Sequence, residues 1–212
     1  MPRGREISER DVQKVAEAAA DLPPASGSSG EEDYVTNLLV TVVDYMLKTA
    51  IVVNALRHFR DHRWDEVRTL DDLEGVLARF DDDQAGNTAL AQYLWGYNLW
   101  TRAEQLRRLV RFFREIGVTD EAQLEAWAHA SSFGNDFQGR VKGLGRAAYE
   151  SLLMRVGVET VKPDVHVKRF AESAVGRPLD DTEVVDVAVR AAKRLGMRAN
   201  ELDLRIWEAS QK

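Results

Sequence analysis

Apolar residues recur at helical spacing along almost the whole of this 212-residue chain. No stretch of alternating apolar and polar residues is longer than about four, which leaves little material for strands. An amphipathic helix buries its apolar stripe against other helices. The sequence therefore predicts an all-α protein, long enough to enclose a core in one large domain or two small lobes.

The expected helices lie on both sides of one linker. Residues 23–33 (PPASGSSGEED) are rich in Pro, Gly and Ser and separate a first helix, residues 7–22, from the rest. Residues 34–59 are apolar on most sides, which indicates a central buried element. Thr101 and Glu104 have the spacing of a capping box. Further helices are expected at residues 70–80, 87–95, 101–116, 120–130, 146–155, 164–175, 181–195 and 199–210.

Two features within residues 138–170 have chemical meaning. Gly143, Leu144 and Gly145 predict a turn whose backbone amides can approach a phosphate, because the glycines have no side chain in the way. Asp164 follows Pro163 and begins the next helical pattern, where an aspartate accepts hydrogen bonds from backbone amides and is held rigidly. A phosphate-binding turn followed by a rigid acid suggests an enzyme that acts on a nucleic acid strand.

These residues resemble the helix-hairpin-helix (HhH-GPD) superfamily of base-excision DNA glycosylases. Its members carry a Gly-hydrophobic-Gly hairpin and, about twenty residues later, an Asp-x-His-Val-x-Arg-like segment with a catalytic aspartate. Asp164 follows Gly145 by 19 residues. The matching residues are Gly143, Leu144, Gly145 and Arg146 in the hairpin, and Asp164, His166, Val167 and Arg169 after it. A fainter likeness at residues 49–59 and 96–106 extends the resemblance to residues 34–210.

The resemblance implies a two-lobed helical bundle. Residues 1–33 would be an N-terminal helix and flexible linker, and residues 34–212 an HhH-GPD-like domain whose second lobe is completed by both chain ends. The hairpin would occupy residues 138–157 and the start of the catalytic-Asp helix residues 163–170. A break is implied near residues 46–48. No iron–sulfur cluster domain is expected, because the chain contains no cysteine.

For Asp164 the resemblance implies catalysis. Cleavage between the sugar and the base passes through an oxocarbenium-like state, and a carboxylate beneath the sugar stabilises that charge and orients water. Plain N-capping is the alternative, and one residue can do both. Family members with strand-cleaving activity carry a nucleophilic lysine just after the hairpin, where this chain has Ala147. A monofunctional enzyme that uses water is therefore expected.

The expected DNA contacts come from the hairpin and the segment after Asp164. Lys142, Gly143, Leu144, Gly145 and Arg146 are the hairpin candidates. His166 either orients Asp164, contacts phosphate or merely packs, and Arg169 either holds DNA backbone or pairs with a carboxylate. No cofactor is expected, although the resemblance leaves room for a monovalent cation on the hairpin carbonyls. His58 and His62 are four residues apart, but the arginines beside them favour a solvated helix end over a metal site.

A base-flipping enzyme needs a pocket for the extruded base and a side chain that fills the gap. The candidate residues for these roles are Trp95, Tyr97 and Trp100 in an aromatic cluster with Tyr93, and Tyr45, Met46 and Leu47 as the wedge. Aromatic residues at this density also occur in ordinary cores. Relatives often place a glutamine at the wedge, and this chain has none there.

A net charge of −6 is unusual for a DNA-binding protein, so the distribution of charge matters. Residues 61–83 are mainly acidic, whereas basic residues outnumber acidic ones over residues 138–170. One acidic and one basic face would still orient the protein on double-stranded DNA. Each charge run taken alone is also explained by an ordinary surface exposed to solvent. No run of 18 apolar residues and no apolar signal core occurs, so a cytoplasmic monomer without membrane contact is expected, nucleoid-associated in a bacterium.

Two functions follow as hypotheses. The first is a monofunctional DNA glycosylase of base-excision repair that removes a damaged or mismatched base. The second is a catalytically inactive, glycosylase-like module that recognises DNA structure or damage. A helical protein whose basic face binds an acidic partner is a third possibility, which the hairpin glycines do not support.

Overall fold

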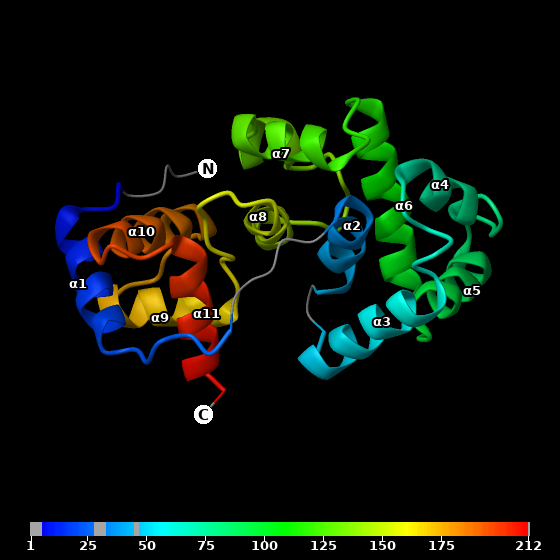
Figure 1. Cartoon of the computed structure of the whole chain (residues 1–212). Coiled ribbons are helices and arrows are strands. Elements are labelled where there is room, and N and C mark those ends of the chain that lie inside the picture. Colours follow the sequence, from blue (N-terminus) through cyan, green and yellow to red (C-terminus); the bar gives the residue numbers. More distant parts are fainter. Residues whose placement is uncertain (1–5, 28–32, 45–46, 212) are drawn as a thin grey trace. The chain divides into compact units, whose positions relative to one another are not determined.

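The computed structural model describes residues 6–27, 33–44 and 47–211, and every regular element in these ranges is a helix (Figure 1). The all-α class is thereby confirmed for the described residues. None of the helices in this part of the chain is both long and apolar enough to cross a bilayer. The elements are α1 (Glu9–Ala20), α2 (Tyr34–Val43), α3 (Thr49–His62), α4 (Leu70–Leu77), α5 (Gln84–Trp95), α6 (Trp100–Glu115), α7 (Glu121–Ala130), the π-helix η1 (Phe133–Phe137), α8 (Arg146–Arg155), α9 (Val165–Val175), α10 (Asp181–Arg194) and α11 (Ala199–Ala209).

The chain divides into two compact units. Unit 1 consists of Met1–Glu31 together with Leu153–Lys212, and unit 2 consists of Glu32–Leu152. The boundary falls within α8, so the hairpin residues belong to unit 2 and Asp164 belongs to unit 1.

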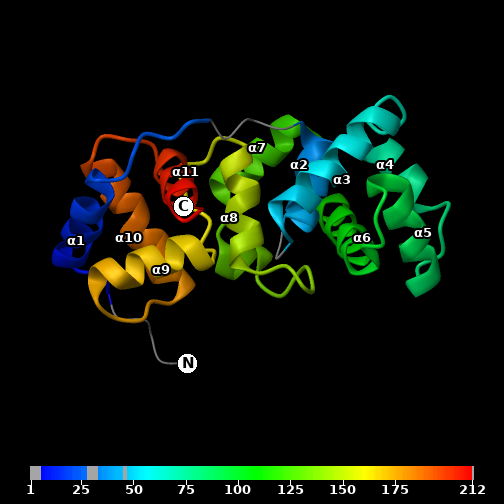
Figure 2. The same ribbon diagram turned by 90° about the horizontal axis from the view of Figure 1, so that it is seen from below.

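Unit 1 packs α1 with α9, α10 and α11 (Figure 2). Helix α1 begins with a capping box, in which the Ser8 side chain accepts the Asp11 amide and the Asp11 carboxylate accepts the Ser8 amide. The Lys14 ammonium donates to the Val175 carbonyl over 2.9 Å, which joins α1 to the end of α9. The core contains Val12, Val15, Val161, Val167, Val184, Val187, Leu202 and Ile206.

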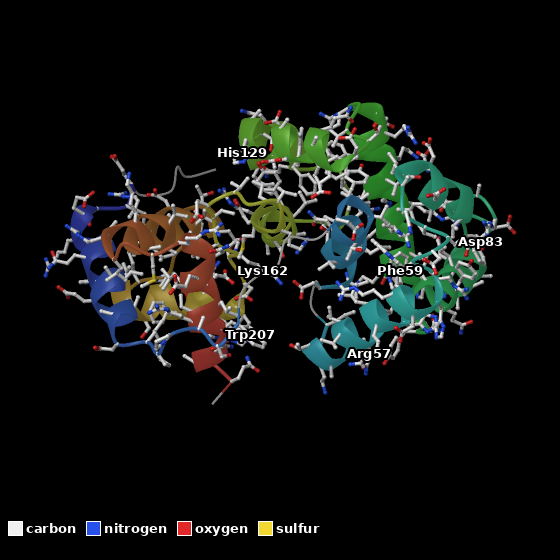
Figure 3. The ribbon with its side chains drawn as sticks, viewed as in Figure 1. Arg57, Phe59, Asp83, His129, Lys162 and Trp207 are labelled. Atoms are coloured by element: carbon white, nitrogen blue, oxygen red, sulfur yellow. The ribbon has the colours of Figure 1, made fainter. Side chains whose placement is uncertain are left out.

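Unit 2 is built around α2, whose residues are all buried. This helix lies beside α3 and α6 (Figure 1), which explains why its sequence is apolar on nearly every side. Phe59 of α3 is fully buried and meets the Trp64 ring edge-on (Figure 3). A second group of aromatic rings fills the space between α6, α7, η1 and α8. Its members are Phe112, Phe113, Trp127, Phe137 and Tyr149.

The expected capping box of Thr101 and Glu104 is wrong. Helix α6 begins at Trp100, with Leu99 as the N-cap residue and no side-chain cap. The Leu99 carbonyl accepts the amides of Arg102 and Ala103, so Thr101 lies inside the first turn. Glu104 forms an ion pair with Arg108 one turn later instead of bonding back to the helix start.

Candidate nucleic-acid interface

The glycine turn lies between η1 and α8, entirely within unit 2. Gly143 has φ +92°, in the left-handed region that favours glycine. The buried Leu144 anchors the turn, and its amide donates to the Val141 carbonyl over 3.1 Å. Lys142 is exposed beside them. The turn therefore presents one lysine and a stretch of backbone without large side chains to solvent.

The two hairpin glycines are there for different reasons. A Cβ on Gly143 would lie 2.6 Å from Nε2 of Gln105, in addition to the strain of its positive φ. Gly145 has no positive φ, and a Cβ there would meet nothing within 4 Å. Gly143 is thus needed for the turn, whereas the space in front of Gly145 is open to a ligand.

Helix α6 supports the turn through two side chains that the sequence analysis did not identify. Nε2 of Gln105 donates to the Gly143 carbonyl over 3.2 Å, and Nη1 of Arg108 donates to the Lys142 carbonyl over 3.3 Å. These partners are more than thirty residues apart in the chain. Contacts between residues so far apart in the chain cannot be predicted from the local sequence.

Arg146, an expected DNA contact, is engaged within the protein. Its Nε donates to Glu150 over 2.9 Å, and the two side chains are 19% and 5% exposed. The guanidinium also lies 5.5 Å from the centre of the Phe133 ring. The ion pair lies within α8, and the Phe133 contact joins Arg146 to η1, so the guanidinium is held against the protein on two sides. Its role in DNA binding stays a prediction.

Other cations of residues 138–170 differ in how available they are. Arg140 is exposed and lies 5.6 Å from the Phe112 ring centre, and Lys142 is exposed as well. In unit 1, Lys168 pairs with Asp181 over 3.0 Å, whereas Arg169 is exposed. Arg140 and Lys142 in unit 2 and Arg169 in unit 1 are therefore the more accessible of these cations.

Asp164 is the N-cap of α9. Its Oδ1 accepts the amides of His166 and Val167 over 2.8 and 3.1 Å. The preceding segment is held by α11, since the Lys162 amide donates to Asp203 over 2.8 Å. Oδ2 of Asp164 makes no hydrogen bond or ion pair with any residue that the structure describes, and the residue is partly exposed. His166, the second residue of α9, is half-buried.

The aromatic candidates for a base pocket are not equally accessible. Trp95 is fully buried, so its ring is part of the core of unit 2. Tyr97, Trp100 and Leu47 are half-buried. Tyr45 and Met46, the other wedge candidates, lie outside the described residues. Among the aromatic pocket candidates, Tyr97 and Trp100 keep part of their surface exposed, whereas Trp95 does not.

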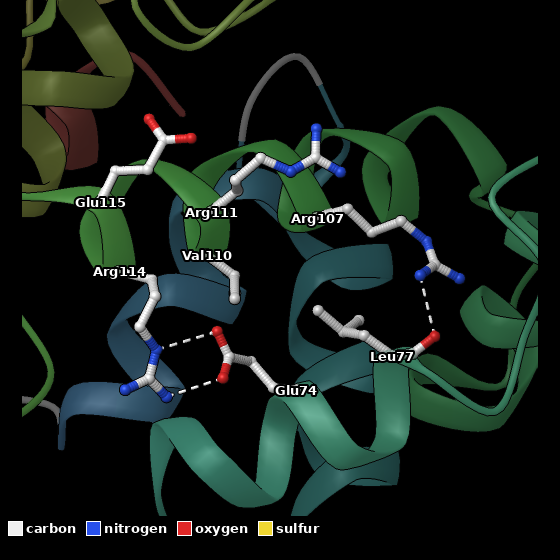
Figure 4. A pocket seen from close by; sticks show the side chains of 7 residues that line it. All are labelled: Glu74, Leu77, Arg107, Val110, Arg111, Arg114 and Glu115. Atoms are coloured by element: carbon white, nitrogen blue, oxygen red, sulfur yellow. Dashed lines mark hydrogen bonds and ion pairs between the residues drawn. The ribbon is translucent and has the colours of Figure 1, made fainter.

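Several acids of residues 61–83 form ion pairs with arginines. Arg114 of α6 pairs with Asp71 and Glu74 of α4, beside a pocket of about 270 Å³ between these helices (Figure 4). Arg107 lines the same pocket and donates to the carbonyls of Leu77 and Phe80 over 2.8 and 2.7 Å, so it caps the end of α4. These arginines join α4 to α6 and are not available to a polyanion.

His58 should make stability depend on pH. Burial and the neighbouring His62 lower its pKa, and its Nε2 is buried without a hydrogen-bond partner among the described residues. As pH falls below the ordinary value of about 6.5, the unfolded chain takes up this proton first, so the free energy of unfolding should fall. Replacing His58 with leucine should flatten that decline in urea titrations between about pH 7.5 and 5.

His129 provides the control for this measurement. It lies near the end of α7 (Figure 3) and is exposed, so His129→Gln should retain the wild-type decline. A His58→Leu variant with the wild-type pH profile would show that His58 is not the responsible group.

Residues 13–211 match the family described as Domain of unknown function (DUF8548). The chain belongs to this family. The match spans both units, so the hairpin and Asp164 both lie inside the DUF8548 domain. No curated protein and no solved structure matches the chain.

Proposed function

We propose that this protein binds double-stranded DNA through its glycine hairpin and hydrolyses the N-glycosidic bond of a damaged or mismatched base with Asp164. The observation that carries the proposal is the state of the Asp164 carboxylate. One oxygen is held by two backbone amides at a helix start, and the other has no partner among the described residues. Such a carboxylate is held in a fixed orientation, with one oxygen available to water.

Hydrolysis of the N-glycosidic bond requires a carboxylate in two roles. As the bond between the sugar and the base breaks, positive charge develops on the sugar, and a negative oxygen beneath it lowers the barrier. The same oxygen can orient the attacking water or accept its proton. With alanine at position 147, no side chain just after the hairpin can attack the sugar, so water is the nucleophile. The product is an abasic site in an intact strand.

The hairpin supplies the means of holding the strand. Gly143 lets the backbone turn, Gly145 leaves the approach open, and Lys142 adds a solvent-exposed positive charge. Backbone amides and lysine contact phosphate without reading bases. Binding through the hairpin should therefore be similar for all duplexes, and selection of the damaged base must come from elsewhere in the protein.

A panel of duplexes with single lesions tests the proposal. It contains uracil, thymine opposite guanine, hypoxanthine, and alkylated and oxidised purines, with an undamaged duplex as the control. At least one lesion should be excised, with strand breaks appearing only after alkali. Borohydride should trap no covalent complex, because no amine attacks the sugar. A trapped adduct, or strand breaks without alkali, would contradict the monofunctional mechanism.

A module that binds DNA without excision is the second candidate. It is favoured by the complete burial of Trp95 and by the lack of a glutamine among residues 45–47. Trp95 is then not free to line a pocket for an extruded base, and the usual side chain that fills the gap in the duplex is missing. If damaged duplexes bind in a gel-shift titration and no member of the panel is excised, this second function replaces the first.

A further inference from the structure

Four carbonyl groups at and beside the hairpin accept hydrogen bonds from within the protein. The Val141 and Gly145 carbonyls accept the amides of Leu144 and Tyr149, each over 3.1 Å. The Lys142 carbonyl accepts Arg108, and the Gly143 carbonyl accepts Gln105. A monovalent cation of the kind that the family resemblance allows would need several of these oxygens at once.

We infer that Gln105 and Arg108 of α6 take the place of a hairpin cation in this protein and hold the turn in its DNA-binding shape. Arginine is always charged, so its guanidinium, 3.3 Å from the Lys142 oxygen, repels any second cation there. The side-chain amide of Gln105 donates a hydrogen bond to the neighbouring oxygen, that of Gly143, and this donor is neutral. The residues present therefore do not fit a monovalent cation. The consequence for DNA rests on the proposed function, whereas the support of the turn does not.

Both side chains are themselves oriented. Nη1 of Arg102 donates to Oε1 of Gln105 over 2.9 Å. Since arginine can only donate, the Gln105 oxygen must face Arg102 and its NH₂ group must face Gly143. Arg108 pairs with Glu104, and these two side chains are only 28% and 35% exposed. The support is therefore preformed before any ligand arrives.

Gln105→Leu tests this role, because leucine keeps the bulk of the side chain and removes the donor. Hydrogen exchange in DNA-free protein should become faster at the hairpin amides 142–145 and stay unchanged in α2 and α5, whereas general destabilisation would speed exchange throughout unit 2. Duplex affinity should fall roughly five- to tenfold with an unchanged slope of log K against log salt, because no cation is lost. Lys142→Ala is the matched control, and it should reduce that slope by about one.

Comparing duplex affinity in sodium and potassium salts tests whether a monovalent cation binds at the hairpin. Wild-type affinity for a duplex should change by less than about twofold between equal concentrations of NaCl and KCl. Arg108→Gln removes the guanidinium charge and should introduce a difference between the two salts.

The failures of the two ideas can be told apart. A tenfold difference between salts in the wild type, or unchanged hairpin exchange in Gln105→Leu, overturns the inference. If the wild type binds no duplex, the proposed function fails, and the exchange of the hairpin amides alone decides whether α6 supports the turn.

Discussion

Replacing Asp164 with asparagine should reduce base excision by roughly two orders of magnitude or more while the protein still folds and binds DNA. Asparagine has the same shape and caps a helix about as well as aspartate, so the amides of His166 and Val167 keep their acceptor. Only the negative charge is lost, and that charge is what the developing positive sugar requires. DNA affinity should be equal to that of the wild type or higher, since a repulsion with phosphate disappears.

Unit 1 contains a matched control for this substitution. Asp180 caps α10 in the same way, with Oδ1 accepting the amides of Thr182 and Glu183 over 2.8 and 2.9 Å. Asp180→Asn should therefore leave single-turnover excision at the wild-type rate. If Asp164→Asn also excises at that rate, Asp164 is a helix cap and nothing more. A loss of activity in both variants would indicate damage to unit 1, which thermal unfolding would reveal.

The helices were predictable because their signals are local. Helix α8 has the bounds that its sequence indicates. The capped start of α9 at Asp164 could likewise be read from Pro163-Asp164 followed by an apolar pattern. Such features depend on neighbours within one or two turns. The prediction of a capping box at Thr101 was wrong because a threonine can also lie within the first turn of a helix. Here the helix begins one residue before Thr101.

The contacts by which α6 supports the hairpin could not be predicted from the sequence. Gln105 and Arg108 reach the turn from a helix that precedes it by more than thirty residues, and nothing in their local pattern distinguishes them from surface residues of an amphipathic helix. Glu150 is different, because its spacing of four from Arg146 was visible. What the spacing did not show is its burial, which turns an ordinary helix-surface pair into one that holds Arg146 inside unit 2.

Replacing Gly145 with leucine should abolish most DNA binding without destabilising the fold. The position has no positive φ and faces open space, so the free energy of unfolding should stay within about 0.5 kcal/mol of the wild type. The new side chain would project into the space through which a phosphate reaches the turn. Affinity should therefore fall roughly tenfold or more, as expected when a charge-assisted contact is lost. Fluorescence anisotropy with labelled duplexes measures this directly.

Gly143→Ala supplies the contrast that makes this result interpretable. Its φ of +92° strains any residue with a Cβ, and that atom would collide with Gln105, so this variant should lose about 1 kcal/mol or more of stability. Weaker binding by Gly143→Ala would thus reflect a damaged turn, and weaker binding by Gly145→Leu a blocked approach. The loss in Gly145→Leu should be the same for every duplex, because phosphate contacts carry no sequence information. A loss confined to one sequence or one lesion would mean that the hairpin faces a base, and the assignment of the turn to the DNA backbone would have to be abandoned.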